Sequence, residues 1–529
     1  MPAVLATALG LWGLTRHDSM WRDESVTYQV AHRPLGELLA LLGRIDAVHG
    51  LYYLLMHGVF ALWDGGLPAL RLPSVLATAL AAAGVGALGT RLAGPRTGVL
   101  AGTLFALLPA TQQYAQEGRS YALVTAGVVW ATYLFLRGLG STARGWWVGY
   151  GVLLAVACWL HEFAALVLCA HAVTLRLLGA PWRRWAVAAA GALVAVGPLV
   201  VVSAGQADRQ LGWLGRPSLA MWLSFLAVSA LGLLLSRVPV PGRVRKVPPG
   251  SRRLACTLAA LSGSPSYAQY EGDPPPCDRT HQTPRALPSG QTALLCGHAL
   301  ADRTVTALAL PLLIVPPGLL ITGSLLRPWY VDRYVLYALA GLALLGGVAL
   351  DRLPGLLGTG PRKGAACLLA AALVAAWLPA SLAVRAPESR KDDVAAVART
   401  VRELARPGDG VLFLPSRRRE WLLSYPALHA RLDDLALARS PAASRTLQGT
   451  ELPPDAIRAR LLATHRVLAL TDPDGQPLDP FPWEAVKRRT LAAYFRECAR
   501  VRVWGAQVVV YVREGPGSVA VRGEGCQRR

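Results

Sequence analysis

Long apolar runs separated by short polar loops fill most of the first 385 residues of the chain. A helix needs about 20 apolar residues to cross a bilayer, and the pattern predicts about eleven spans, some of them short. The first is Pro2–Leu14, which we interpret as a retained helix and not a cleaved signal peptide, because no basic segment precedes it. The other spans are predicted at Leu72–Leu92, Thr97–Gln113, Tyr121–Leu136, Trp146–Leu160, Phe163–Leu178, Trp185–Ser203, Leu219–Ser236, Val305–Leu326, Tyr334–Leu350 and Ala365–Val384.

One apolar segment, Leu51–Trp63, is too short to span a bilayer and is rich in aromatic residues. We interpret it as a helix lying along the membrane interface. Basic residues then gather in alternate loops, which the positive-inside rule places in the cytoplasm together with the N-terminus. The first loop, residues 15–50, and everything after Arg385 fall on the extracytoplasmic side. If the short segment crossed the membrane instead, the side of every later loop would be inverted.

The composition supports a membrane protein. Of the 529 residues, 53% are hydrophobic and only 16% are charged, against about a quarter in soluble domains. The net charge of +22 invites a nucleic-acid interpretation, but the basic residues lie in loops between apolar runs, so we expect no nucleic-acid partner. The eight cysteines form no C-x-x-C pair, which argues against a zinc site.

Two stretches are less apolar. Residues 239–302 are basic and rich in Pro, Gly and Ser, and we expect a poorly ordered cytoplasmic insertion. Residues 386–529 are predicted to form a small extracytoplasmic α/β domain behind a transmembrane domain of residues 1–385, and Cys498 and Cys526 can form a disulfide there. Its predicted strands are Val411–Pro415, Arg466–Thr471 and Val508–Val512, and its predicted helices are Val394–Ala405, Pro454–Ala463 and Trp483–Ala499.

Four polar clusters stand at the extracytoplasmic ends of the predicted spans. They are Asp23-Glu24, then Glu117 with Arg119, then His161-Glu162, and last Arg327 with Asp332 and Arg333. Carboxylates and arginines beside a membrane segment must be solvated, paired or used by the protein.

Each cluster also has a purely structural explanation. Asp23 can cap a short helix, and Glu117 can pair with Arg119. His161-Glu162 can be a satisfied polar break in a helical hairpin, and Arg333 can anchor lipid headgroups. Because the predicted topology brings all four clusters to one face of the membrane, we favour a shared cavity.

A cavity with carboxylates and several arginines suits transfer of a group from a lipid-linked phosphate. Arginine binds phosphate through planar, paired donors, and a carboxylate can accept the proton of a hydroxyl nucleophile. The sequence therefore predicts that the arginines hold the leaving phosphate and that Asp23 deprotonates the acceptor.

Several motifs together resemble a family. They are W-R-D-E after the first span, H-G-L-Y-Y-L-L-M-H from His49, L-R-L-P-S-V-L from Leu70, Y-A-Q-E-G-R-S-Y-A-L from Tyr114 and the late D-R-Y, with K-D-D-V-A-A-V-A-R-T-V-R from Lys391 and P-G-D-G-V-L-F from Pro407 as weaker matches. The chain resembles the GT-C membrane glycosyltransferases, in the branch related to protein O-mannosyltransferases and lipid A aminoarabinose transferases, as in actinobacterial mannosyltransferase-like proteins.

The resemblance implies an inverting transferase that uses a polyprenyl-phosphate sugar, with mannose as the first candidate, on the extracytoplasmic side. It implies that Asp23 is the base and that Arg119 and Arg333 hold the donor phosphate. We interpret Glu24 as supporting Asp23 or binding acceptor or metal. Residues assigned to shape or support the cavity are Glu117, His161, Glu162, His49, Tyr121 and Tyr334. His49-Gly50 departs from the proline-containing turn usual in the family, so this turn lacks the rigidity that proline provides.

The cofactor and the acceptor stay open at this point. Some GT-C enzymes use a divalent metal and others do not, and Asp23 with Glu24 would be the candidate ligands. The D-P-D-G run at Asp472 formally matches a D-x-D metal motif but is typical of a turn. A transporter or flippase for a lipid-linked precursor is the main alternative, although transporters place polar residues near the bilayer midplane and these clusters lie at span ends. A non-catalytic membrane protein that acts through its outer domain is a third possibility.

Overall fold

The computed structural model describes residues 1–211, 215–238, 289–357 and 361–514. The chain divides into two compact units. We call Met1–Trp12, Pro73–Gln116 and Ser120–Leu378 the helical unit, and Gly13–Leu72, Glu117–Arg119 and Pro379–Arg529 the mixed unit. This division differs from the predicted linear boundary at residue 385, because the first loop belongs with the C-terminal domain.

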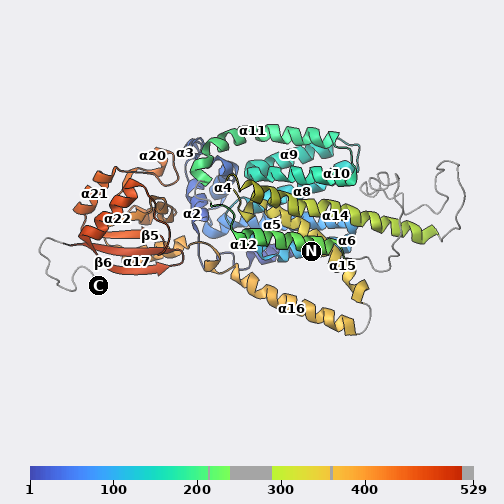
Figure 1. Ribbon diagram of the computed structural model, residues 1–529. Coiled ribbons are helices and arrows are strands. Elements are labelled where there is room, and N and C mark those ends of the chain that lie inside the picture. The colour runs from blue at the N-terminus through green and yellow to red at the C-terminus, as the bar shows by residue number, and fades with distance from the viewer. Residues whose placement is uncertain (212–214, 239–288, 358–360, 515–529) are drawn as a thin grey trace. The chain divides into compact units, whose positions relative to one another are not determined.

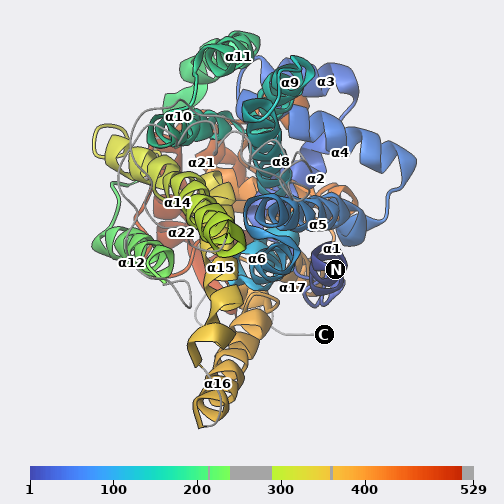
Figure 2. The ribbon, with the colours of Figure 1, turned by 90° about the vertical axis from the view of Figure 1, so that its right-hand side faces the viewer.

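The helical unit is built from long apolar helices, which Figure 2 shows nearly end-on. Six helices in the described ranges are long and apolar enough to cross a membrane, and they lie in α5, α8, α11, α12, α14 and η4–α15. Two helices, α5 and α16, also contribute residues to the mixed unit. The elements are α1 (Pro2–Leu11), α5 (Gly66–Ala93), α6 (Pro95–Leu107), α7 (Pro109–Ala115), α8 (Tyr121–Leu139), α9 (Gly145–Leu160), η2 (Glu162–Leu166), α10 (Val167–Leu178), α11 (Arg183–Leu211), α12 (Leu219–Ser236), α14 (Ser289–Gly323), η4 (Asp332–Ala338), α15 (Leu339–Leu357) and α16 (Pro361–Ala383).

The predicted polytopic helical class is confirmed, but several predicted spans are broken or shifted. The span predicted at Thr97–Gln113 is two helices, because Leu108 precedes Pro109 and takes an extended backbone with ψ of 127°. The insertion predicted as a loop through Asp302 is helical from Ser289 onward, where the Ala- and Leu-rich sequence favours a helix despite its weak periodicity. Residues 239–288 of that predicted insertion lie outside the described residues.

Small residues set the close packing of the helices. A Cβ added at Gly347 on α15 would come within 2.7 Å of Ala101 on α6, and one added at Gly127 on α8 would come within 3.0 Å of Ala157 on α9. Glycine at these points lets two backbones approach, as in membrane helix pairs generally.

The mixed unit holds a five-stranded sheet and a group of short helices. The elements are α2 (Arg22–Ala31), α3 (Leu35–Leu42), η1 (Ala47–His49), α4 (Gly50–Leu62), η5 (Pro387–Ser389), α17 (Val394–Leu404), β1 (Gly410–Leu414), η6 (Ser416–Arg419), α18 (Glu420–Leu423), α19 (Pro426–His429), β2 (Asp433–Asp434), β3 (Leu437–Arg439), α20 (Pro441–Ser444), β4 (Thr450–Glu451), α21 (Pro454–Ala463), β5 (Arg466–Thr471), α22 (Pro482–Tyr494), β6 (Phe495–Val503) and β7 (Ala506–Arg513).

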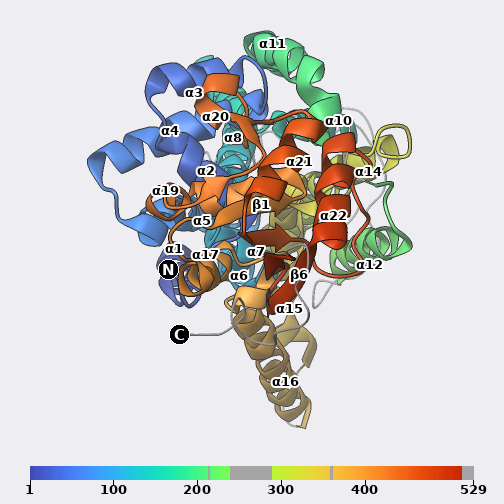
Figure 3. The same ribbon diagram turned by 90° about the vertical axis from the view of Figure 1, so that its left-hand side faces the viewer.

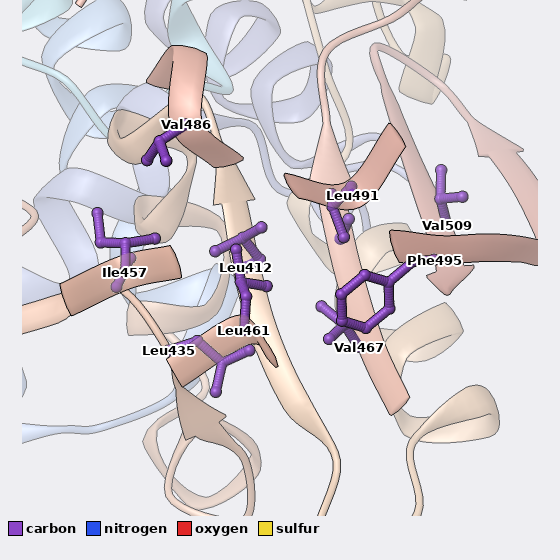
Figure 4. Close-up of a cluster of buried hydrophobic side chains, with 11 residues drawn as sticks. Leu412, Leu435, Ile457, Leu461, Val467, Val486, Leu491, Phe495 and Val509 are labelled. Carbon is purple, nitrogen blue, oxygen red and sulfur yellow. The ribbon is translucent and has the colours of Figure 1, made fainter. Parts of the chain in front are cut away.

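The sheet has the strand order β2-β1-β5-β7-β6. The central pair β1 and β5 is parallel, with Gly410 opposite Val467, and β7 runs antiparallel to both β5 and β6. Helices α21 and α22 cover one face and α17 lies on the other (Figures 1 and 3). Buried side chains of alternate strand positions, such as Leu412, meet Leu461 of α21 and Leu491 of α22 in one apolar core (Figure 4).

The predicted α/β domain is confirmed, with one error. The helix predicted at Trp483–Ala499 ends at Tyr494, and β6 begins at the next residue. Pairing with β7 along most of its length outweighs the helix-forming tendency of its Arg, Glu and Ala residues. The D-P-D-G run forms a turn with Gly475 at φ +82°, as the turn interpretation required. Cys498 lies on β6 and is disulfide-bonded, whereas Cys526 lies outside the described residues.

The first loop, residues 15–50, is folded. It contains α2 and α3, and together with α4 it forms a small apolar core of Val26, Val30, Leu38, Leu41 and Tyr53, against which Leu447 of the C-terminal domain packs. The segment predicted as an interfacial helix is α4, a helix of 13 residues. Its position at a membrane interface stays a prediction.

Candidate active site

Glu24 is a buried acidic residue of the mixed unit that binds two arginines. Its side chain is fully buried, and its two oxygens accept bonds from Arg16 at 2.5 Å and from Arg71 at 2.7 and 2.8 Å. The backbone N–H of Gly118 donates to the same carboxylate at 3.1 Å. Burial alone would raise the pKa of Glu24, but the two arginines outweigh it and hold that pKa at about 2. Glu24 is therefore ionised at every physiological pH.

This carboxylate also starts the helix that carries Asp23. Helix α2 begins at Arg22, and Glu24, its third residue, reaches back toward the N–H of Trp21 at 3.5 Å. Glu24 therefore has the helix-capping role that the sequence analysis considered for Asp23. Asp23 is half-buried in the first turn of the same helix.

These residues do not fit a divalent metal. Both oxygens of Glu24 already bind two arginines, and a cation beside them would be repelled. Among the described residues, no group of three His, Cys, Asp or Glu side chains is arranged to hold a metal ion. Of the roles considered for Glu24, support of Asp23 agrees better with its contacts than metal binding does.

Arg119 lies in a chain of polar groups in the same unit. Its Nη1 donates to the hydroxyl of Tyr53 at 3.2 Å and lies 3.4 Å from the hydroxyl of Thr27. The Tyr53 hydroxyl donates in turn to the buried Asp46. Burial raises the pKa of Asp46, and the nearby charge of Asp23 raises it further, while Arg119 lowers it. Asp46 is therefore close enough to both Asp23 and Arg119 to respond to their charges.

Glu117 and His49 also lie in the mixed unit. Glu117 forms a buried ion pair with Arg390 at 3.4 Å, a partner that the sequence analysis did not consider. His49 is buried, and its ring lies edge-on to Tyr53 with centroids 6.1 Å apart. Asp46, Tyr53, Arg71 and Arg390 were not singled out from the sequence. Arg71 lies in the L-R-L-P-S motif, which was the one local indication of its importance.

The remaining predicted residues gather in the helical unit. His161 separates α9 from the short helix η2, and its ring lies 4.3 Å from that of Tyr334 and 5.9 Å from that of Tyr121. Arg333 donates from Nε to the Tyr121 hydroxyl at 3.0 Å, and its guanidinium lies over the Tyr121 ring at 5.4 Å. The structure thus brings these four residues into one cluster. Glu162 accepts instead from Ser203 of α11 at 2.7 Å.

A carboxyl group near α2, on a side chain that is only 15% exposed, gives the mixed unit a pH dependence. Burial raises the pKa of Glu420 to about 7 from its ordinary 4.5, although Arg418 lies 3.4 Å away. The folded state then binds this proton more tightly than the unfolded state, so stability falls as the pH rises from 4.5 to about 7. We expect Glu420→Gln to remove this pH-dependent contribution. The melting temperature of the variant minus that of wild type should therefore increase as the pH rises from about 5 to about 8.

Thermal unfolding at a series of pH values measures this effect. Glu403→Gln is the control, because Glu403 is an exposed glutamate of the same domain. A constant difference between Glu420→Gln and wild type across that range would contradict the expectation.

The chain is similar to known proteins in part of its sequence and in its fold. Residues 51–205 match the model of a family described as dolichyl-phosphate-mannose-protein mannosyltransferase. The structure is similar to apo ArnT from Cupriavidus metallidurans, with a TM-score of 0.50 and 14% identity over 92% of this chain and 93% of that chain. The same protein bound to undecaprenyl phosphate gives a TM-score of 0.48 and 15% identity over 96% and 97% of the two chains.

A more distant similarity is to the archaeal oligosaccharyltransferase AglB from Archaeoglobus fulgidus, solved with an inhibitory peptide and a dolichol-phosphate. Its TM-score is 0.46, with 12% identity over 98% of this chain and 74% of that chain. No curated protein sequence matches the chain. The match to apo ArnT shows that the two chains share a fold, in agreement with the fold expected from the resemblance to the GT-C membrane glycosyltransferases.

Proposed function

We propose that this chain is a GT-C glycosyltransferase that moves a sugar from a polyprenyl-phosphate donor to an acceptor on the extracytoplasmic side of the membrane. The observation that carries the proposal is the arrangement of the mixed unit, where the buried Asp46 lies within reach of the charges of both the half-buried Asp23 and the buried Arg119. A carboxylate can take a proton from a hydroxyl group, and an arginine can hold a phosphate. The GT-C fold and the family match over residues 51–205 support the same activity.

The proposed step is a single displacement. Asp23 accepts the proton of an acceptor hydroxyl, whose oxygen attacks the anomeric carbon of the sugar. The bond from that carbon to the phosphate oxygen breaks with its electron pair, and polyprenyl phosphate leaves as the anion. One displacement inverts the anomeric centre. Arg119 and Arg333 offset the charge that develops on the leaving phosphate.

The other residues have supporting roles in this proposal. Glu24, fixed by Arg16 and Arg71, holds the first turn of α2 and hence Asp23. Glu117, His49, His161, Glu162, Tyr121 and Tyr334 shape the surroundings of the reacting groups.

Mannose is the first candidate sugar, because the matched family is described by dolichyl-phosphate-mannose. The extracytoplasmic location of the C-terminal domain is supported by the arginine-rich alternate loops and by the disulfide-bonded Cys498, since disulfides persist in oxidising compartments.

Removal of Arg333 is expected to weaken use of the donor. We expect Arg333→Ala to lower kcat/KM for the donor by about 10- to 100-fold, the range that corresponds to loss of one hydrogen bond to a charged group. Arg333→Lys should recover only part of the lost kcat/KM, because lysine lacks the paired donors of arginine. Steady-state kinetics with varied donor measure the change. Arg327→Ala is the control, because Arg327 is an exposed arginine at the start of the same connection; an equal loss in both variants would count against a phosphate-binding role.

The proposed function is tested with purified protein in nanodiscs and a panel of polyprenyl-phosphate sugars, with polyprenyl-phosphomannose first. The expected result is formation of a glycosylated acceptor and release of polyprenyl phosphate. A second arm places the protein in liposomes and follows movement of the intact donor between leaflets. Donor that crosses the bilayer without losing its sugar would support the transporter instead.

A further inference from the structure

The helix that carries Asp23 is held by residues from the far end of the chain. Within the mixed unit, Asp392 Oδ1 accepts the backbone N–H of Arg22 at 2.9 Å, and Asp393 Oδ1 lies 3.4 Å from the backbone N of Met20. The N–H of Val394 donates to the carbonyl of Met20 at 2.6 Å. The turn that precedes α2 is therefore fixed on both sides of Trp21 by three consecutive residues of the C-terminal domain.

Asp392 serves this turn as a cap supplied from another part of the sequence. The first N–H groups of a helix have no partner inside the helix and need one from a side chain or from water. Arg22 is the first residue of α2, so Asp392 satisfies one of these groups and also places negative charge at the positive end of the helix. The Arg22 side chain adds an ion-pair contact to Asp392 at 3.7 Å.

The position of Asp392 is itself fixed. Its side chain is almost fully buried, and its second oxygen accepts the indole N–H of the fully buried Trp421 at 3.2 Å. Next along the same segment, Ser424 and the carbonyl of Glu420 both lie 2.6 Å from the hydroxyl of Ser25 on α2. These contacts join α2 to α18 and leave little freedom for the first turn.

We propose that Asp392 is a positioning residue for the transfer reaction and that the C-terminal domain sets the place of Asp23 through it. Asp23 follows Arg22 directly, so a shift of the Arg22 backbone moves the Asp23 carboxylate with it. A displacement of about 1 Å between reacting groups can cost about 100-fold in rate. This proposal rests on the proposed function, because it concerns the base of that reaction.

The first test needs no activity. Hydrogen exchange is measured on the whole protein in nanodiscs for wild type, Asp392→Ala and Asp409→Ala. Asp409 is a matched control, because it is similarly buried, accepts a backbone N–H from Arg406 at 2.7 Å and pairs with Arg466. Asp392→Ala should speed exchange at residues 20–27, and Asp409→Ala should leave those amides unchanged. Unchanged exchange in Asp392→Ala, or equal acceleration in both variants, would overturn the proposal even if the chain transfers no sugar.

The second test uses the reaction. We expect Asp392→Ala to lower kcat about 100-fold with little change in the KM for the donor, and Asp392→Asn, which keeps an oxygen acceptor, to recover part of the rate. The double variant Asp23→Asn/Asp392→Ala should be no slower than Asp23→Asn, because both changes remove the same function. Multiplicative losses in the double variant, or the same kcat loss in Asp409→Ala, would assign Asp392 a role in stability alone.

Discussion

Glu24→Gln should destabilise the mixed unit by about 3 to 5 kcal/mol, the range for breaking a buried ion pair by removing one partner. Glutamine keeps the shape of the side chain but leaves the buried Arg16 and Arg71 without the carboxylate that both bind. Thermal unfolding in nanodiscs, followed by circular dichroism, measures the loss. Glu37→Gln is the control, because Glu37 is an exposed glutamate on the neighbouring helix α3.

The pH dependence of this ion pair has a definite sign. The folded pKa of Glu24 is about 2, below its ordinary 4.5, so its contribution is fully present above pH 4.5 and is lost as the pH falls toward 2. Wild type and Glu24→Gln should therefore differ by a constant amount at neutral pH and converge only in acid. A melting temperature of Glu24→Gln equal to that of Glu37→Gln would show that the buried network does not hold the first loop.

Asp23→Asn should lower kcat for sugar transfer about 1,000-fold, within the range attributed to general base catalysis. The amide has nearly the same size but cannot accept a proton, so binding of the donor should change little. Steady-state kinetics under saturating donor and acceptor measure the effect.

Asp18→Asn provides the matched control for this change. Asp18 lies in the same loop, is exposed and has a left-handed backbone with φ of 59°, a conformation that asparagine tolerates well. Its kcat should equal that of wild type. A rise in KM for Asp23→Asn with kcat unchanged would point to a binding role for Asp23 instead of a base.

Local patterns explain what the sequence could predict. Strands β1, β5 and β7 are continuous runs of β-branched and apolar residues, and α17 and α21 have clear starts, so their positions were found within a few residues. The acidic pair after the first span and the His161 break between α9 and η2 were visible for the same reason. Each is a polar interruption in an apolar run.

Contacts between distant residues explain what it could not predict. Arg71 is 47 residues from Glu24, and Asp392 is 370 residues from Arg22. No periodicity relates residues at these separations, so the partner of each carboxylate appears only once the chain is folded. The end of α22 was missed because β6 is defined by its pairing with β7, whereas its own residues also suit a helix.

The most direct test of the account is the rate of polyprenyl phosphate release from polyprenyl-phosphomannose by wild type and Asp23→Asn in matched nanodiscs. Wild type should release polyprenyl phosphate as it transfers sugar, and this release should fall about 1,000-fold in Asp23→Asn. Equal release by the two proteins would remove Asp23 from the chemistry, and no release from any polyprenyl-phosphate sugar by folded wild type would contradict the transferase function itself.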